Sequence, residues 1–333
     1  MDNLLKEPLT ILFQNFLKAV PDATELHAID MIEKNAFVSA GSIGGGASSI
    51  ERLTPFVETA MSRMANESMV KKGQSSFLDT NENRLIFIKV EELLLCFVLD
   101  IEARIDDIVP YAYILADKVN FLAQGETINL NIPAVSSSSR AGGLFDYKQY
   151  LDLLSSDTRY NVKLIFIGDA AVGKTSLINR YATKTFKENF LPTLGVSITS
   201  NKVELPNSRV TVQFSTWDMG GQENFKRVRS KYYSGARACF MVFDLAERSS
   251  FENLVNWEKE KDQFAGKIIT IVLGNKNDLT RGVSRQEAED FANQHGYTYV
   301  ETSALTGNNV PESFQLLAFK ILNSDLETQR ESI

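Results

Sequence analysis

Residues 168–175 combine two glycines, a lysine and a threonine at the spacing G-x-x-x-x-G-K-[ST]. The apolar stretch 162–167 before them is typical of a buried strand, and residues 176–181 have the pattern of a helix start. A glycine loop between a strand and a helix surrounds one concavity with backbone N–H groups and the positive helix end. The sequence therefore predicts a phosphate-binding loop, in which Lys174 reaches the outer phosphates and the Thr175 hydroxyl ligates Mg²⁺.

A second group of residues follows the predicted strand at 210–217. An acidic side chain at a strand end beside a phosphate loop is suited to hold Mg²⁺, and Asp218 has that position. The N–H group of Gly221 can meet the terminal phosphate, and Gln222 can orient an attacking water. These residue types predict hydrolysis of a nucleoside triphosphate.

A third group indicates which base is bound. Asp278 follows the strand predicted at 268–273, and its carboxylate can accept hydrogen bonds from N1–H and the exocyclic amine of guanine. Adenine lacks that pair of donors. Ser303 and Ala304 follow the last predicted strand, where a backbone N–H can meet the guanine carbonyl oxygen. The pattern favours a guanine-nucleotide site over the ATP site of a kinase.

The elements around these residues alternate between strands and helices. Strands are predicted at 162–167, 210–217, 238–243, 268–273 and 297–300, and helices at 251–264, 284–295 and 310–323. Such alternation predicts a mainly parallel sheet with helices on both faces. Ligands of these sheets bind at the carboxyl ends of the strands, which is where the three groups of residues fall.

The first 130 residues have another order: helix, two strands, helix, three strands, helix. The helices are expected at 9–20, from the capping box Ser48-x-x-Glu51 to about 70, and at 105–122, and the strands within 25–42 and 77–99. We expect domains at 1–130 and 160–324 and a tail at 325–333. The linker between them, 131–159, is rich in serine and glycine and contains either a short helix at 145–154 or no structure.

Composition places the chain among ordinary globular proteins, with 44% hydrophobic residues among 333. The net charge of −7 argues against a nucleic-acid groove. No apolar run approaches the ~20 residues of a membrane-spanning helix. Cys96 and Cys239 lie in apolar runs and are expected to be buried thiols in a reducing compartment, so we expect a cytoplasmic protein.

Residues 160–323 resemble the Ras-like small GTPases, and most closely the Rab-type branch, in the order and spacing of these motifs. The fold class implied is α/β, a P-loop GTPase domain with a mainly parallel six-stranded sheet. The resemblance implies GTP and GDP as ligands, Mg²⁺ held by Thr175, Thr193 and Asp218, and catalysis by Gln222, Lys174 and Thr193. It implies nucleotide contacts from Gly168, Asp169, Ala170, Ala171, Val172, Gly173, Lys174, Thr175, Ser176, Phe186, Phe190, Thr193, Gly221, Asn275, Lys276, Asp278, Ser303, Ala304 and Leu305.

The resemblance also implies how such a site acts. No arginine finger is identifiable in cis, so hydrolysis is expected to be slow until an activating protein supplies one, an effect of roughly 10⁵-fold in Ras. An exchange factor and an effector are the other implied partners. The chain ends at Ile333 without a terminal cysteine, so we expect no direct lipid anchor, and any recruitment to membranes through partners or through the N-terminal domain. A nucleotide-locked scaffold with negligible turnover is the alternative function.

The first 130 residues resemble the roadblock fold, on the order of their elements and on residues 77–80, 84–90 and 93–100. Longin domains, which have a different element order, are the alternative. Roadblock domains dimerise and serve as platforms for Ras-like GTPases. The resemblance therefore implies a homodimer formed through this domain and a regulatory role for it.

Overall fold

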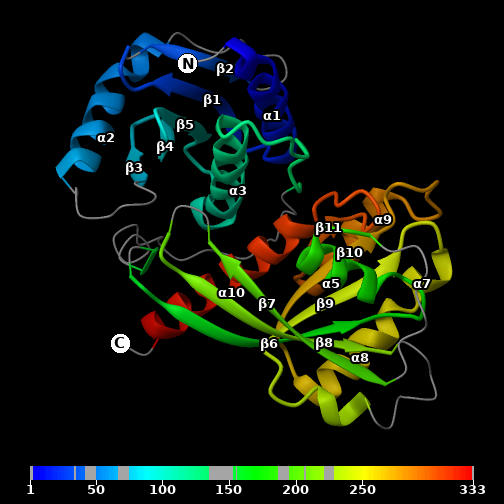
Figure 1. Ribbon diagram of the computed structural model, residues 1–333. Helices are drawn as coiled ribbons and strands as arrows, with labels where there is room; N and C mark the ends of the chain where they lie inside the picture. The colour runs from blue at the N-terminus through cyan, green and yellow to red at the C-terminus, as the bar shows by residue number, and fades with distance from the viewer. Residues whose placement is uncertain are drawn as a thin grey trace. The chain divides into compact units, whose positions relative to one another are not determined.

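The computed structural model describes residues 3–33, 35–41, 50–66, 75–134, 153–154, 156–186, 195–205, 208–220 and 229–331 (Figure 1). The chain forms two compact units. One contains Met1–Val135, and the other contains Arg159–Glu204 and Thr211–Ile333. Each unit has its own sheet.

The N-terminal unit has the predicted order of elements. A 3₁₀ turn, η1 (Asn3–Leu5), leads into α1 (Lys6–Ala19), β1 (Ala23–Asp30), β2 (Ala36–Gly41), η2 (Ile50–Leu53), α2 (Thr54–Asn66), β3 (Ser75–Asp79), β4 (Asn83–Val90), β5 (Leu93–Asp100) and α3 (Ile105–Ala123). α2 begins later than the predicted capping box, because η2 precedes it; Ser48 itself lies outside the described residues. The order is compatible with a roadblock-like fold.

The sheet of this unit is antiparallel, in the strand order β2-β1-β5-β4-β3. β5 is buried on both faces, because alternate side chains meet different helices. Cys96 belongs to a core cluster with Val57 and Ala60 of α2, while the ring of Phe97 lies 5.2 Å from that of Phe16 of α1. Figure 1 accordingly draws α2 on one side of the sheet and α1 and α3 on the other. This smaller domain is therefore a three-layer α/β structure.

The C-terminal unit contains the six-stranded sheet that the sequence predicts. Its elements are β6 (Arg159–Ile167), α5 (Lys174–Thr183), β7 (Val196–Glu204), β8 (Thr211–Met219), η4 (Ser230–Tyr232), β9 (Ala238–Asp244), α7 (Arg248–Glu252), α8 (Leu254–Ala265), β10 (Ile269–Asn275), α9 (Arg285–His295), β11 (Thr298–Glu301) and α10 (Val310–Glu331). The strand order is β11-β10-β9-β6-β8-β7, and all neighbours are parallel except the β7–β8 pair. The predicted fold class, α/β with a mainly parallel sheet, is confirmed.

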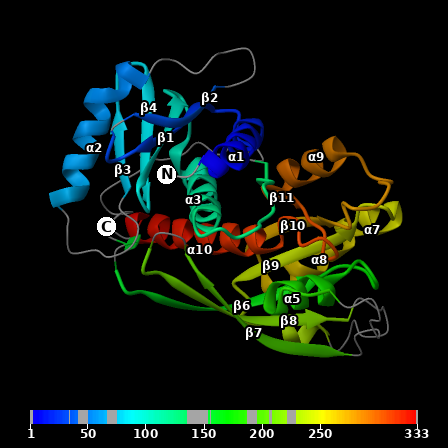
Figure 2. The same cartoon turned by 45° about the horizontal axis from the view of Figure 1, so that its top comes forward.

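Helices cover both faces of this sheet. On one face, the ring of Phe314 of α10 lies 5.2 Å from that of Phe240 of β9, and α10 follows this face in Figure 2. On the other face, Trp257 of α8 and Ala288 of α9 join a core with Met241 of β9. The core therefore fixes β6, β8, β9 and β10 as a rigid platform, at whose carboxyl edge the loops described below begin.

Three details differ from the sequence prediction. The sequence pattern does not predict β7, because this strand lies at the sheet edge and most of its residues are polar and exposed. The helix expected at 251–264 is two helices, α7 and α8, joined at Asn253. α10 continues past residue 323 to Glu331, because Leu326 is buried and Asp325 pairs with Arg237 at 2.6 Å.

Two further expectations concern cysteine and membranes. Cys96 and Cys239 are both free and buried, as predicted, and burial raises the pKa of each thiol. Within the described ranges, no helix is both long and apolar enough to cross a membrane. The helix considered at 145–154 falls almost entirely outside the described residues.

Candidate nucleotide-binding site

The phosphate loop joins β6 to α5 at the carboxyl edge of the sheet. Gly168 has a φ of 138°, and a Cβ added there would lie 2.0 Å from the carbonyl oxygen of Val242 on β9. Gly173 has a φ of 98°, and its added Cβ would lie 2.2 Å from Nδ2 of Asn275. Both positions require glycine, because the backbone conformation and the neighbouring atoms exclude a side chain. The glycine spacing of the motif thus has a direct steric cause.

Lys174 is the first residue of α5 and is 6% exposed. Its Nζ donates hydrogen bonds to the carbonyl oxygens of Gly168 and Asp169 at 2.7 and 2.6 Å. Burial lowers the pKa of Lys174 to about 8, although the charges of Asp218 and Asp169 oppose that shift. The loop therefore holds a desolvated cation, which an anionic ligand would stabilise.

Thr175 and Asp218 meet beside this cation. The Thr175 hydroxyl donates a short hydrogen bond to the carboxylate of Asp218, which is 3% exposed near the end of β8. Mg²⁺ takes oxygen ligands, and a hydroxyl and a carboxylate at a phosphate loop can bind it together with substrate phosphates. The two side chains therefore fit that ion. Elsewhere in the described part of the chain, no three His, Cys, Asp or Glu residues gather as a metal site.

Asn275 connects the phosphate loop to the loops after β10 and β11. It is 1% exposed, and its Nδ2 donates to the carbonyl oxygen of Val172 at 2.8 Å. Its Oδ1 accepts from the backbone N of Ala304 at 3.2 Å and from the Thr302 hydroxyl at 3.3 Å. One amide thus holds together the loop after β6 and the loops after β10 and β11.

Asp278 lies in the loop after β10, where the Ser303 hydroxyl donates a short hydrogen bond to its carboxylate. Lys276, in the same loop, has a φ of 65° and forms an ion pair with Asp244 at 2.6 Å. The loop after β11 is tied in turn to α5, because Nη2 of Arg180 donates to the carbonyl oxygen of Leu305 at 2.7 Å. The structure therefore gathers the predicted base-contacting residues at one end of the sheet.

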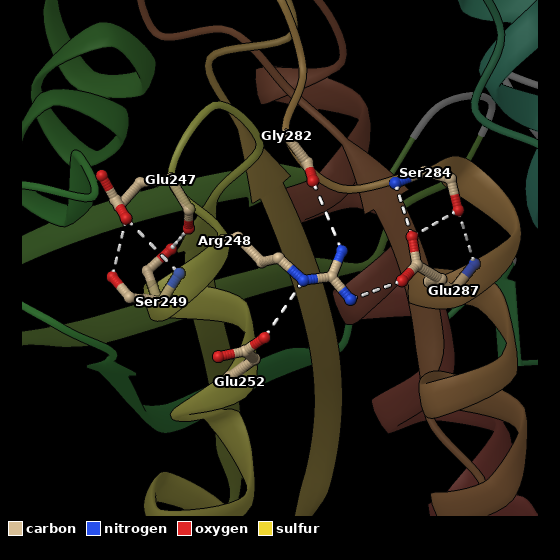
Figure 3. Close-up of polar contacts among 8 residues, drawn as sticks. Glu247, Arg248, Ser249, Glu252, Gly282, Ser284 and Glu287 are labelled. Atoms are coloured by element: carbon tan, nitrogen blue, oxygen red, sulfur yellow. Dashed lines mark hydrogen bonds and ion pairs between the residues drawn. The ribbon is translucent and has the colours of Figure 1, made fainter.

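Figure 3 shows the polar contacts between the start of α7, the loop after β10 and the start of α9. Arg248, at the start of α7, donates to Glu252 at 3.0 Å, to Glu287 at 2.8 Å and to the carbonyl oxygen of Gly282 at 3.5 Å. Glu287 also closes a capping box with Ser284 at the start of α9. The hydrogen bond from Arg248, followed by those from Ser284, lowers the pKa of Glu287 to about 2. Charge-assisted hydrogen bonds from Arg248 thus join the start of α7 to the loop after β10 and to the start of α9.

The predicted site residues fall into three groups by where they lie. Gly168, Asp169, Ala170, Ala171, Val172, Gly173, Lys174, Thr175 and Ser176 form the loop and the first turn of α5. Phe186 is half-buried at the end of a described range, and Leu305 is 47% exposed. Phe190, Thr193, Gly221 and Gln222 lie outside the described residues. The nucleotide, metal and catalytic roles assigned to all of these residues stay predictions.

Sequence reasoning missed two residues that bind the phosphate loop. Asn253 and Trp257 both donate to Oδ1 of Asp169, at 2.5 Å from Nδ2 and 2.7 Å from Nε1. The sequence carried one signal for this contact, because the indole N–H of a buried tryptophan needs a hydrogen-bond partner. It gave no means of choosing Asp169 as that partner.

The fold and this site define an α/β domain of the P-loop class, with the glycine loop after β6 and the loops after β10 and β11 at the carboxyl edge of its sheet. The sequence profile of the Ras family matches residues 163–323. Ras-related protein Rab-13 of Mesocricetus auratus is 39% identical over 163 residues, which cover 48% of this chain and 79% of that protein. The chain therefore belongs to the Ras family, and its C-terminal unit is a Rab-like small GTPase domain.

Other relatives give the same assignment. Ras-related protein Rab-11C of Dictyostelium discoideum is 38% identical over 164 residues, 48% of this chain and 72% of that protein. Ras-related protein RABE1e of Arabidopsis thaliana is 35% identical over 186 residues, 54% of this chain and 84% of that protein. These matches support the Rab-type branch that the motifs indicated.

Proposed function

We propose that this protein is a GTP-binding and GTP-hydrolysing switch. The observation that carries the proposal is the joint placement of Lys174, Asn275 and Asp278 by the hydrogen bonds described above. A desolvated ammonium at the loop suits phosphates, and a carboxylate in the base loop suits the two donors of guanine. Membership of the Ras family supports the same ligand.

In the proposed reaction, the side chains bind and orient rather than react. Lys174 and the loop amides stabilise charge on the phosphates, and Gln222 positions water in line. Mg²⁺ bound by Thr175, Asp218 and Thr193 would offset the charge that develops on the phosphates. Loss of the γ-phosphate would release Thr193 and the Gly221 N–H, and that change is the signal read by an effector.

Gln222→Leu is expected to abolish most of the hydrolysis while GTP affinity stays unchanged. The leucine cannot orient water, and a misplaced reactant costs up to about 10²-fold in rate. Single-turnover release of phosphate from protein loaded with GTP measures this effect. The matched control is Gln213→Leu, which makes the same exchange on β8. The Gln213 amide donates a hydrogen bond to the Ser200 hydroxyl at 2.8 Å. Equal and negligible rates in wild type and Gln222→Leu would favour the nucleotide-locked scaffold instead.

We infer slow intrinsic turnover from the lack of an identifiable arginine finger in the sequence, so an activating protein completes the site. An exchange factor and an effector are the other partners proposed. We further propose a cytoplasmic location, with any recruitment to membranes made through these partners or through the N-terminal domain.

The N-terminal domain is proposed to be a roadblock-like dimerisation and regulatory domain. The order of its elements supports this. Among the described residues its sheet ends in two edge strands, β2 and β3, and a sheet edge is where a second chain can pair. The full chain is therefore expected to have about twice its monomer mass of 37.2 kDa in solution. Light scattering during size-exclusion chromatography measures this, and a mass of one chain at micromolar concentration would contradict the dimer.

A further inference from the structure

A buried ion pair lies between α8 and the residues that precede η4. Arg229 is 4% exposed and Glu260 is 7% exposed. The guanidinium donates to the two carboxylate oxygens at 2.6 and 2.8 Å, and the Tyr233 hydroxyl donates to the same carboxylate at 2.9 Å. Paired bonds of this kind fix the plane and direction of the guanidinium. Because burying two charges is costly, the pair is weak evidence for stability and calls for another role.

The third contact of Arg229 indicates that role. Its Nη1 donates to the carbonyl oxygen of Gly220 at 3.1 Å. The N–H of Gly220 donates to the carbonyl oxygen of Gly195 at 2.9 Å, so Gly220 is held from both sides. The next residue is Gly221, whose N–H is proposed to meet the γ-phosphate. Arg229 thus holds Gly220, the residue directly before the one assigned that donor.

The other end of the arrangement is the phosphate loop. The guanidinium carbon of Arg229 lies 4.2 Å from the centroid of the Trp257 ring, which is the geometry of a cation–π contact. The same indole donates its N–H to Asp169 at 2.7 Å. Trp257 is 5% exposed, so water screens neither contact effectively. One side chain therefore touches Asp169 with its edge and Arg229 with its face.

We propose that Trp257 and Arg229 are positioning residues that couple the phosphate loop to the residues after β8, through the path Asp169–Trp257–Arg229–Gly220. Glu260 orients Arg229 within this path. The coupling favours the triphosphate state, because the path ends at Gly220, directly before the residue whose N–H is assigned to the γ-phosphate, and begins at a loop that both nucleotides use. The inference rests on the proposed GTP switch and names the residues that set its preference between GTP and GDP.

The test is a double-mutant cycle on nucleotide release from the full chain. Release of GDP and of a non-hydrolysable GTP analogue is measured for wild type, Arg229→Lys, Trp257→Phe and the double variant. Each single variant is expected to speed release of the GTP analogue relative to GDP by roughly 10-fold, within the usual range of coupling between sites. The double variant is expected to change the ratio of the two release rates little more than either single variant does, because both exchanges interrupt one path.

Arg237→Lys is the matched control. The Arg237 guanidinium pairs with Asp325 at 2.6 Å on an exposed surface, and the exchange keeps the positive charge, so we expect the ratio to stay unchanged. A purely structural role would lower the melting temperature and speed both releases equally. An unchanged ratio in both single variants would therefore overturn the coupling, as would a double variant whose effect equals the product of the two. A wild type that binds neither nucleotide would overturn the proposed function as well.

Discussion

Replacing Asp278 with asparagine is expected to lower GTP affinity by on the order of 10²–10⁴-fold, because two hydrogen bonds to a charged group are each worth about 1.5–3 kcal/mol. The asparagine amide offers a donor where the guanine N1–H and amine need an acceptor. It can instead pair with xanthine, which carries a carbonyl in place of the amine. Affinity for xanthosine triphosphate is therefore expected to rise as GTP affinity falls. Titration with fluorescent analogues of the two nucleotides measures both changes.

The control for this exchange is Asp290→Asn, which makes the same substitution in α9, where the Asp290 carboxylate accepts a bond from Gln286 at 2.8 Å. It should leave both affinities unchanged. Asp278 also accepts a hydrogen bond from the Ser303 hydroxyl, and asparagine keeps an oxygen for that bond. The loop is thus expected to keep its conformation. GTP affinity that does not change in the Asp278 variant would contradict the base contact.

The sequence was most informative where chemistry restricts both residue type and position. The glycines at 168 and 173 were placed correctly in a strand–loop–helix unit, because any side chain there would meet Val242 or Asn275. The order of elements in the N-terminal domain also followed from periodicity, because apolar residues at helix or strand spacing must face one core. Both signals stand in short contiguous stretches of the sequence, although Val242 and Asn275 themselves are distant along the chain.

What the sequence did not reveal has causes that are distant along the chain. β7 shows little apolar alternation, since its place at the sheet edge leaves most of its side chains exposed. The bond between Trp257 and Asp169 joins residues 88 positions apart, and the Arg229–Glu260 pair spans 31. Periodicity says which face of α8 is buried but not which polar atoms meet there. These contacts depend on the packing of whole elements.

Gly173→Ala is expected to destabilise the GTPase domain and to weaken nucleotide binding together. A non-glycine residue at a φ of 98° is strained, at a cost of about 1–3 kcal/mol. The new Cβ would also displace the Asn275 amide, and leaving that buried group without its partners costs roughly a further 1–3 kcal/mol. Because Asn275 joins the phosphate loop to the base loops, the displacement separates the two halves of the site.

Gly235→Ala separates the two costs. Gly235 has a φ of 75°, and among the described residues no atom beyond its chain neighbours lies within 4 Å of its added Cβ. It carries the strain without the collision. In urea unfolding, we expect the free energy of unfolding to fall from wild type to Gly235→Ala and further to Gly173→Ala. Only Gly173→Ala is expected to lose nucleotide affinity. If the two alanine variants unfold at the same urea concentration, Asn275 has moved aside without a loss of stability. Its hydrogen bonds to the three loops would then not be what stabilises the site.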